Sequence, residues 1–381
     1  AAYIGVDNKA RKVSKGYIGV DGVARKIKKG YVGVGGVARL CWSGEPEVVK
    51  YGSSEDGAIS PLSVARRALA AVSVGNYGLF GGGAESDSTY YSAVDAYDSD
   101  LIRTTPTSLR QARYGLAAVA VGSYGLFGGG GGSGGSNYST VDAYNSNLTR
   151  TTPTALSEAR YEPSGVAAGS YGLFGGGNIS SNSDIVDAYN SSLTRTTPTT
   201  FGEARGYLAA VQVGNYGLFG GGQSNRLKGD CSNVDAYNSS LTRTTPTGLS
   251  QARYRLSAAS VGNYGLFGGG YSSDSGSVTS NTVDAYNSSL TRTTPMALSQ
   301  ARYWIAAVSL GNCALFGGGH GDSSDYSDVD AYDSNLTRTT PIILSQPRGD
   351  LEAVEVGGYG LFGGGGYGND IFSTVDVYTI A

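Results

Sequence analysis

Two short motifs recur in step along most of this 381-residue chain and restrict its fold more than any other feature. Tyr-Gly-Leu-Phe-Gly-Gly-Gly occurs seven times, once with Cys-Ala in place of Tyr-Gly, at spacings of 47, 47, 45, 48, 49 and 46 residues. Val-Asp-(Ala/Val)-Tyr follows each copy. A strand-rich repeat of this length is typical of β-propellers, in which each repeat forms one blade. The sequence therefore predicts an all-β fold with seven blades.

The repeat at residues 107–153 shows how one blade is built. Strand-like runs cover residues 116–121, 124–128, 140–144 and 148–152, and turn residues separate them. Four such strands in up-and-down order form one propeller blade. The last repeat stops after its third strand, so we expect residues 47–60 to supply the missing outer strand and to close the ring without an open edge.

Three features of each unit resemble the Kelch repeat: the glycines after the second strand, the tyrosine of the third strand and a Pro-x-x-Leu-Ser-x-Ala-Arg lead-in. This resemblance covers residues 47–381 and implies a Kelch-type propeller with four antiparallel strands per blade. The chain departs from the Kelch pattern in the fourth strand, where residues such as Arg150 and Thr151 replace the usual aromatic residue. We therefore expect a more polar outer strand.

Residues 1–46 differ from the rest and are interpreted as a separate module. Residues 3–44 are three 14-residue units, such as YIGVDGVARKIKKG. Asp-Asn, Asp-Gly and Gly-Gly between strand-like runs favour two-residue turns, so the units predict three short β-hairpins. Residues 1–44 carry nine Lys or Arg and two Asp, whereas the remainder carries 19 basic and 29 acidic residues. Isolated hairpins are marginally stable, so we expect this module to serve attachment or oligomerisation, for example in a homotrimer.

Every repeat carries one arginine ahead of its first strand and one aspartate in its third strand. Their equal number and fixed phase predict buried structural ion pairs, because a carboxylate between packed sheets needs a partner. The clearest expected pairs are Arg113 with Asp142, Arg160 with Asp187, and Arg253 with Asp284.

The near-identical repeats differ at two places, just beyond the arginine and in the loop after the glycines, which up-and-down order puts on one face. Variation on one face of a rigid scaffold is typical of a recognition surface, with unselected loop drift as the alternative. Aromatic residues and arginine are frequent binding anchors. The candidate ligand-binding residues are Glu162, Tyr207, Arg255, Trp304 and Asp350 at the first place, and Tyr90, Arg226 and His320 at the second.

No catalytic constellation stands out in the sequence. His320 is the only histidine, which disfavours a two-imidazole copper site or a Ser-His-Asp triad, and we expect it to be a solvent-exposed loop residue. Glu162 and Asp350 are weak candidates for a glycosidase carboxylate pair. We therefore expect no enzymatic activity, no cofactor and no metal ion.

The Tyr-Ile-Gly-Val…Val-Ala-Arg-Lys units resemble segments of tail and minor structural proteins of phages and prophages of Gram-positive bacteria. This resemblance implies a receptor-binding protein in which residues 1–44 contact other virion proteins and the propeller recognises a bacterial surface glycan or protein. No secretory signal and no disulfide framework are recognisable, as expected for a virion protein made in the host cytoplasm. We expect no nucleic-acid binding and no membrane insertion. A surface adhesin, a protein-binding Kelch scaffold, and a glycan hydrolase or lyase remain open.

Overall fold

The computed structural model describes residues 2–6, 9–13, 16–20, 23–27, 29–34, 37–43, 47–225, 229–274 and 276–381. The N-terminal region contains three antiparallel hairpins, which pair β1 with β2, β3 with β4 and β5 with β6. Their strands are β1 Ala2–Val6, β2 Lys9–Val13, β3 Gly16–Val20, β4 Val23–Ile27, β5 Lys29–Val34 and β6 Val37–Ser43. The expected turn dipeptides at 7–8, 21–22 and 35–36 lie outside the described residues.

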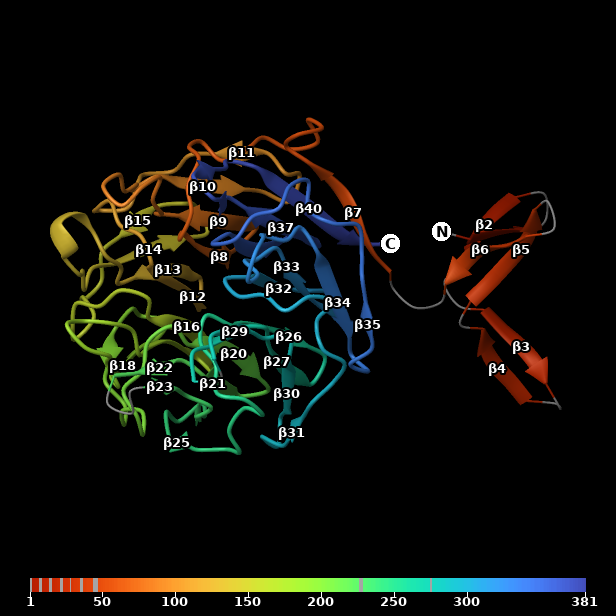
Figure 1. Cartoon of the computed structure of the whole chain (residues 1–381). Helices are drawn as coiled ribbons and strands as arrows, with labels where there is room; N and C mark the ends of the chain where they lie inside the picture. Colours follow the sequence, from red (N-terminus) through yellow and green to blue (C-terminus); the bar gives the residue numbers. More distant parts are fainter. Residues whose placement is uncertain are drawn as a thin grey trace.

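Seven four-stranded antiparallel sheets surround a central axis, so the predicted seven-bladed propeller is confirmed (Figure 1). The innermost strands of blades 1 to 7 are β8 Ala70–Val74, β12 Ala117–Val121, β16 Ser164–Ala168, β20 Ala209–Val213, β26 Ser257–Val261, β32 Ala306–Leu310 and β36 Glu352–Val356. The second strands are β9 Tyr77–Gly81, β13 Tyr124–Gly128, β17 Tyr171–Gly175, β21 Tyr216–Gly220, β27 Tyr264–Gly268, β33 Cys313–Gly317 and β37 Tyr359–Gly363.

The third and fourth strands complete the blades. The third strands are β10 Val94–Tyr97, β14 Val141–Asn145, β18 Val186–Tyr189, β24 Val234–Tyr237, β30 Val283–Asn287, β34 Val329–Asp333 and β40 Val375–Ile380. The outer strands are β11 Arg103–Thr104, β15 Arg150–Thr151, β19 Arg195–Thr196, β25 Arg243–Thr244, β31 Arg292–Thr293, β35 Arg338–Thr339 and β7 Val48–Ser53. Loops between second and third strands hold β22 Gln223–Ser224, β23 Gly229–Asp230, β28 Tyr271–Ser272, β29 Val278–Thr279, β38 Gly366–Tyr367, β39 Asp370–Ile371 and the 3₁₀ turn η1 Ser133–Gly135.

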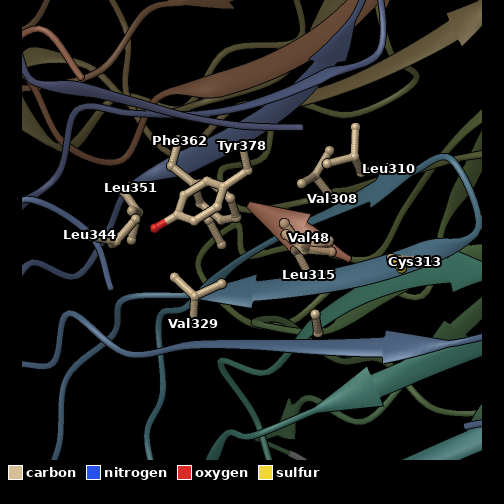
Figure 2. Close-up of a cluster of buried hydrophobic side chains, with 12 residues drawn as sticks. Val48, Val308, Leu310, Cys313, Leu315, Val329, Leu344, Leu351, Phe362 and Tyr378 are labelled. Carbon is tan, nitrogen blue, oxygen red and sulfur yellow. The ribbon is translucent and has the colours of Figure 1, made fainter. Parts of the chain in front are cut away.

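Hydrophobic side chains fill the spaces between neighbouring blades, because successive residues of a strand point to opposite faces of its sheet. In blade 2, Phe127 packs with Tyr144 against blade 1, whereas Leu126 packs against blade 3. Figure 2 shows the corresponding cluster between blades 6 and 7, which contains Leu315, Phe362 and Val48 of β7. Both faces of each blade are therefore buried along the second and third strands, which explains why these strands are mostly apolar, with one buried aspartate in each third strand.

The glycines after the second strand allow adjacent blades to approach closely. Gly129 has φ 72°, and a Cβ atom on it would lie 2.7 Å from the carbonyl oxygen of Arg160 in the next blade. The N–H of Gly130 donates to that same carbonyl at 2.9 Å. Since side chains are disfavoured both by the backbone conformation and by the contact, this glycine pair fixes blade spacing.

Two boundaries differ by more than one residue from those expected. The outer strand of blade 2 covers only Arg150–Thr151, because Leu148 has φ 59° and the preceding residues form a turn. In that turn the Asn145 side chain accepts hydrogen bonds from the N–H groups of Asn147 and Thr149, both at 3.0 Å. The strand that pairs with β40 covers residues 48–53, a shorter segment than residues 47–60. Within the described part of the chain, no helix is long and apolar enough to cross a membrane.

The repeated arginines and aspartates are buried partners within each blade. Arg113 Nη2 lies 2.9 Å from Asp142 Oδ2, and both side chains are completely buried. The same nitrogen donates to the carbonyl oxygen of Phe127 at 3.2 Å. Equivalent contacts of 2.8 and 2.9 Å join Arg160 to Asp187 and Arg253 to Asp284. Each pair fastens the lead-in segment of a blade to its own third strand.

Candidate ligand-binding cavity at the propeller axis

The second residue after each buried arginine lies at the mouth of a central cavity, and we call these seven residues the axial ring. All seven have left-handed φ values, between 49° and 56°. Six of their N–H groups donate to the carbonyl oxygen of the ring residue in the preceding blade, at 2.6–3.2 Å. The axial ring consists of Ala68, Gly115, Glu162, Tyr207, Arg255, Trp304 and Asp350.

This backbone conformation is unfavourable for residues other than glycine, and such strain is typical of functional sites held by their surroundings. Here the backbone hydrogen bonds between neighbouring blades fix the position of the Cα atom of each ring residue. The cavity inside the ring has a volume of about 280 Å³. Small residues of the inner strands, among them Ala118, Gly165 and Ala258, line its deeper part.

Arg255 is stacked among aromatic side chains of the cavity. Its guanidinium carbon lies 3.9 Å from the ring centre of Trp304, 5.0 Å from that of Tyr207 and 5.1 Å from that of Tyr254. Such cation–π contacts favour the charged guanidinium at this position. Its buried Nε has no hydrogen-bond partner among the described residues.

Carboxyl groups of Glu162, Asp350 and Glu352 line the same cavity. Removal from bulk water raises the pKa of Glu162 to about 8; Arg255 opposes this rise, and Asp350 adds to it. Desolvation likewise raises the pKa of Glu352 to about 8, with a further contribution from Asp350 and an opposing one from the N–H of Ala353. The Oε2 atom of Glu162 is buried and has no hydrogen-bond partner within the described part of the chain. The cavity thus combines one arginine, two large aromatic residues and three carboxyl groups.

His320 lies at the edge of this site rather than in solvent, contrary to expectation. Its side chain is only 18% exposed, with Nδ1 2.5 Å from Asp325 Oδ1 and Nε2 3.8 Å from Asp350 Oδ2. Its ring also lies 5.5 Å from that of Trp304. Burial alone would lower the pKa of His320, but the contacts with Asp350 and Asp325 outweigh it and raise the pKa above the ordinary value.

We therefore expect His320 to titrate above about 6.5, the usual value for histidine. Since the folded-state pKa is raised, the charged imidazole stabilises the fold below the unfolded-state pKa, and this contribution is lost as pH rises through the folded-state value. One histidine C2 proton signal, followed by NMR against pH, reports this pKa directly because the chain has a single histidine.

The variant Asp325→Asn should lower the pKa of His320. Asp322→Asn is a matched control, since Asp322 lies in the same loop but accepts from the N–H of Thr279, at 3.3 Å. If His320 of the unmodified protein titrates with a pKa at or below about 6.5, the result would contradict its assigned contacts with Asp325 and Asp350.

The remaining expected site residues are not part of the cavity wall. Tyr90 stacks on Tyr114 with ring centres 5.0 Å apart. It begins a collar of neighbouring aromatic rings, 5.0–6.5 Å apart, on the same face of the propeller. The collar continues through Tyr114, Tyr161, Tyr207, Tyr254, Tyr271 and Tyr303. Arg226 lies outside the described residues.

Sequence reasoning missed Glu352 and most of this tyrosine collar. Glu352 was overlooked because it falls inside a scaffold strand, although the equivalent residues of other blades are alanine or serine, for example Ala117 and Ser257. A glutamate at a position where the other repeats have alanine or serine could therefore have identified this residue from the sequence. Across the part of the chain that the structure describes, no group of three or more His, Cys, Asp or Glu side chains could hold a metal ion.

Comparison with known proteins places the chain by fold only. No family profile matches it, and no curated protein matches it in sequence. A solved structure titled "Structure of YjhT" aligns with a TM-score of 0.58 and 12% sequence identity, over 74% of this chain and 99% of that chain. At this identity the similarity shows a shared β-propeller architecture and nothing more specific.

Proposed function

We propose that this chain is a receptor-binding protein of a phage or prophage tail, whose Kelch-type propeller recognises a glycan on the bacterial surface. The central cavity is the observation that carries the proposal. Aromatic, cationic and acidic side chains from five different blades converge in it, on the face where the repeats differ. Aromatic faces suit the apolar face of a sugar ring, while charged groups orient hydroxyls by hydrogen bonds.

The size of the cavity favours a sugar over a protein surface. The cavity volume of about 280 Å³ lies just below the range for small-molecule sites, roughly 300–1,000 Å³. One sugar residue of a polysaccharide is of that order, whereas a stable protein interface needs a much broader contact area. The three N-terminal hairpins, by contrast, provide backbone units of regular spacing for contacts with other tail proteins.

A glycan array probed with the full-length protein tests the recognition proposal. The double variant Trp304→Ala with Tyr207→Ala should bind at least about tenfold more weakly, since aromatic anchors dominate binding energies. Alanine is compatible with this backbone, because Ala68 occupies the same ring position with φ 52°. Tyr367→Ala is the matched control, as Tyr367 is 48% exposed and lies outside the cavity lining.

Unchanged binding of the double variant would refute recognition through the cavity. Release of reducing ends from a bound glycan would instead favour the hydrolase or lyase alternative, with Glu162 and Asp350 as candidate residues. Attachment has its own test: deletion of residues 1–44 should prevent incorporation into particles, and incorporation of the truncated protein would contradict the tail assignment.

A further inference from the structure

We infer that the central cavity selects a sugar residue with a free, positively charged amino group, a hexosamine that is not N-acetylated. This inference rests on the proposed glycan recognition and specifies its ligand. It follows from the order of the axial ring, from the way Arg255 is held, and from a carboxyl oxygen of Glu162 that has no partner among the described residues.

The axial ring has one side with small residues and one side with large residues. Ala68 of blade 1 and Gly115 of blade 2 stand between Asp350 of blade 7 and Glu162 of blade 3. Tyr207, Arg255 and Trp304 occupy the opposite side, on blades 4 to 6. The sector with the smallest ring residues is therefore flanked by a carboxyl group on either side, and a Cβ atom on Gly115 would lie 3.1 Å from Glu162 Cγ.

A third carboxyl group deepens this acidic side. Glu352 begins the inner strand β36, two residues after Asp350, and lines the same cavity. The corresponding residues of the adjacent blades are Ala70 and Ala306, which carry no charge. The acidic group is therefore local to one sector of the wall, as a site for a single cationic substituent requires.

Arg255 does not neutralise these acids by direct pairing. No carboxylate lies within salt-bridge distance of its guanidinium among the residues that the structure describes, and the guanidinium stacks on the faces of Trp304 and Tyr207. Glu162 Oε2, shielded from solvent, lacks a donor in the same part of the chain. A buried polar atom without a hydrogen-bond partner is unfavourable. An ammonium supplies three N–H donors, which Oε2 can accept once the carboxyl is ionised.

Proton linkage gives the inference a second readout. Burial raises the pKa of Glu162 and of Glu352 to about 8 and so favours the protonated form of both carboxyls near pH 7 when no cation is bound. The other charged or titratable groups around this cavity are Asp350, Arg255 and Tyr207 of the axial ring and His320 at the edge. An arriving ammonium favours the ionised carboxylates, so binding should release protons to the buffer.

The experiment measures binding of a panel of methyl glycosides to the full-length protein by calorimetry. The panel contains glucosamine, galactosamine and mannosamine, each with its N-acetylated form and its parent hexose. At least one amino sugar should bind about tenfold or more tightly than both its counterparts, the scale of one charge-assisted hydrogen bond. Repeating the titration near pH 7 in buffers of different ionisation enthalpy should show proton release.

Three variants assign this preference to the acidic sector. Glu162→Gln and Glu352→Gln should each reduce the preference and the proton release. Glu355→Gln is the control, because Glu355 lies on the same strand outside the cavity lining, where its Oε1 accepts from the N–H of Gly358 at 2.8 Å.

A blocking variant tests the location independently. Ala68→Trp should fill the free space and abolish binding without unfolding the ring, since Trp304 adopts nearly the same backbone conformation, with φ 49° against 52° at Ala68. Thermal unfolding of the variant verifies that it is folded.

The outcomes separate this inference from the function it rests on. If N-acetylated or parent sugars bind as tightly as the amino sugars, or if the array identifies only glycans without free amines, the inference is overturned and glycan recognition stands. If neither the panel nor the array yields a ligand, both the inference and the proposed function fail.

Discussion

Replacing Asp142 with alanine is expected to lower the free energy of unfolding by about 3–5 kcal/mol, a large part of the roughly 5–15 kcal/mol typical of a folded domain. Asp142 and Arg113 are both completely buried, with Oδ2 and Nη2 2.9 Å apart. The substitution would leave the guanidinium buried without its counter-charge. It would also remove the acceptor of the Arg110 N–H, which lies 3.2 Å from the carboxylate.

Two matched variants separate the cost of an unpaired charge from the value of the pair. Replacing both partners, with Arg113→Met and Asp142→Leu, should destabilise less than Asp142→Ala, because no buried charge is then left unpaired. Arg150→Ala should cost less than about 1 kcal/mol, since Arg150 is 26% exposed and its Nε lies 3.7 Å from Asp142. Urea unfolding followed by circular dichroism measures all three. A change below about 1 kcal/mol for Asp142→Ala would contradict a structural role for the pair.

The number of blades follows from the sequence because one repeat makes one blade. The repeat length is given directly by the spacing of the Tyr-Gly-Leu-Phe-Gly-Gly-Gly motifs, such as the one that contains Leu126. The second strand of blade 2, Tyr124–Gly128, has the predicted bounds. The outer strand was predicted too long, because the strand-like sequence pattern begins at Leu148. In the structure Leu148 has a left-handed backbone conformation, with φ 59°, so strand pairing begins only after it. The alternation of apolar and polar residues shows where the sequence is compatible with a strand. The geometry of the preceding turn decides where the strand begins.

The candidate site was accessible from sequence only in part. Comparison of repeats singled out Glu162, Arg255 and Trp304 as variable positions, and the ring geometry brings them around one cavity. Stacking of Arg255 on Trp304 depends on the neighbouring blades meeting at the axis, which no single repeat encodes. His320 was expected to be exposed because it follows a glycine run, yet its contact with Asp325 comes from a turn whose course the sequence does not specify.

Strand β7 closes the ring and also completes the last set of ion pairs. It pairs with β40 of the C-terminal blade, although more than 300 residues separate the two strands (Figure 1). Lys50 Nζ lies 2.6 Å from Asp376 Oδ1, where the outer strands of other blades supply an arginine such as Arg103. Val48 is 7% exposed and belongs to the cluster between blades 6 and 7 (Figure 2).

Deletion of residues 1–53 is therefore expected to abolish the cooperative unfolding transition or to lower its midpoint by more than about 10 °C. The deletion exposes the β40 edge to intermolecular pairing, removes the burial of Val48, worth about 1.5–3 kcal/mol, and separates Asp376 from one of its two cations. Together these losses are expected to remove a large part of the roughly 5–15 kcal/mol of stability typical of a folded domain.

Deletion of residues 1–46 is the matched control, because it removes the hairpins and keeps the whole of β7. Its thermal transition should stay within about 2 °C of that of the full-length propeller domain, since no strand of a blade is lost. Differential scanning calorimetry, with light scattering for aggregation, distinguishes the two truncations. Equal stability of both would mean that the closing strand contributes little. Ring closure would then depend on the packing of blade 7 against blade 1, which includes contacts of β36 with β8 and β9.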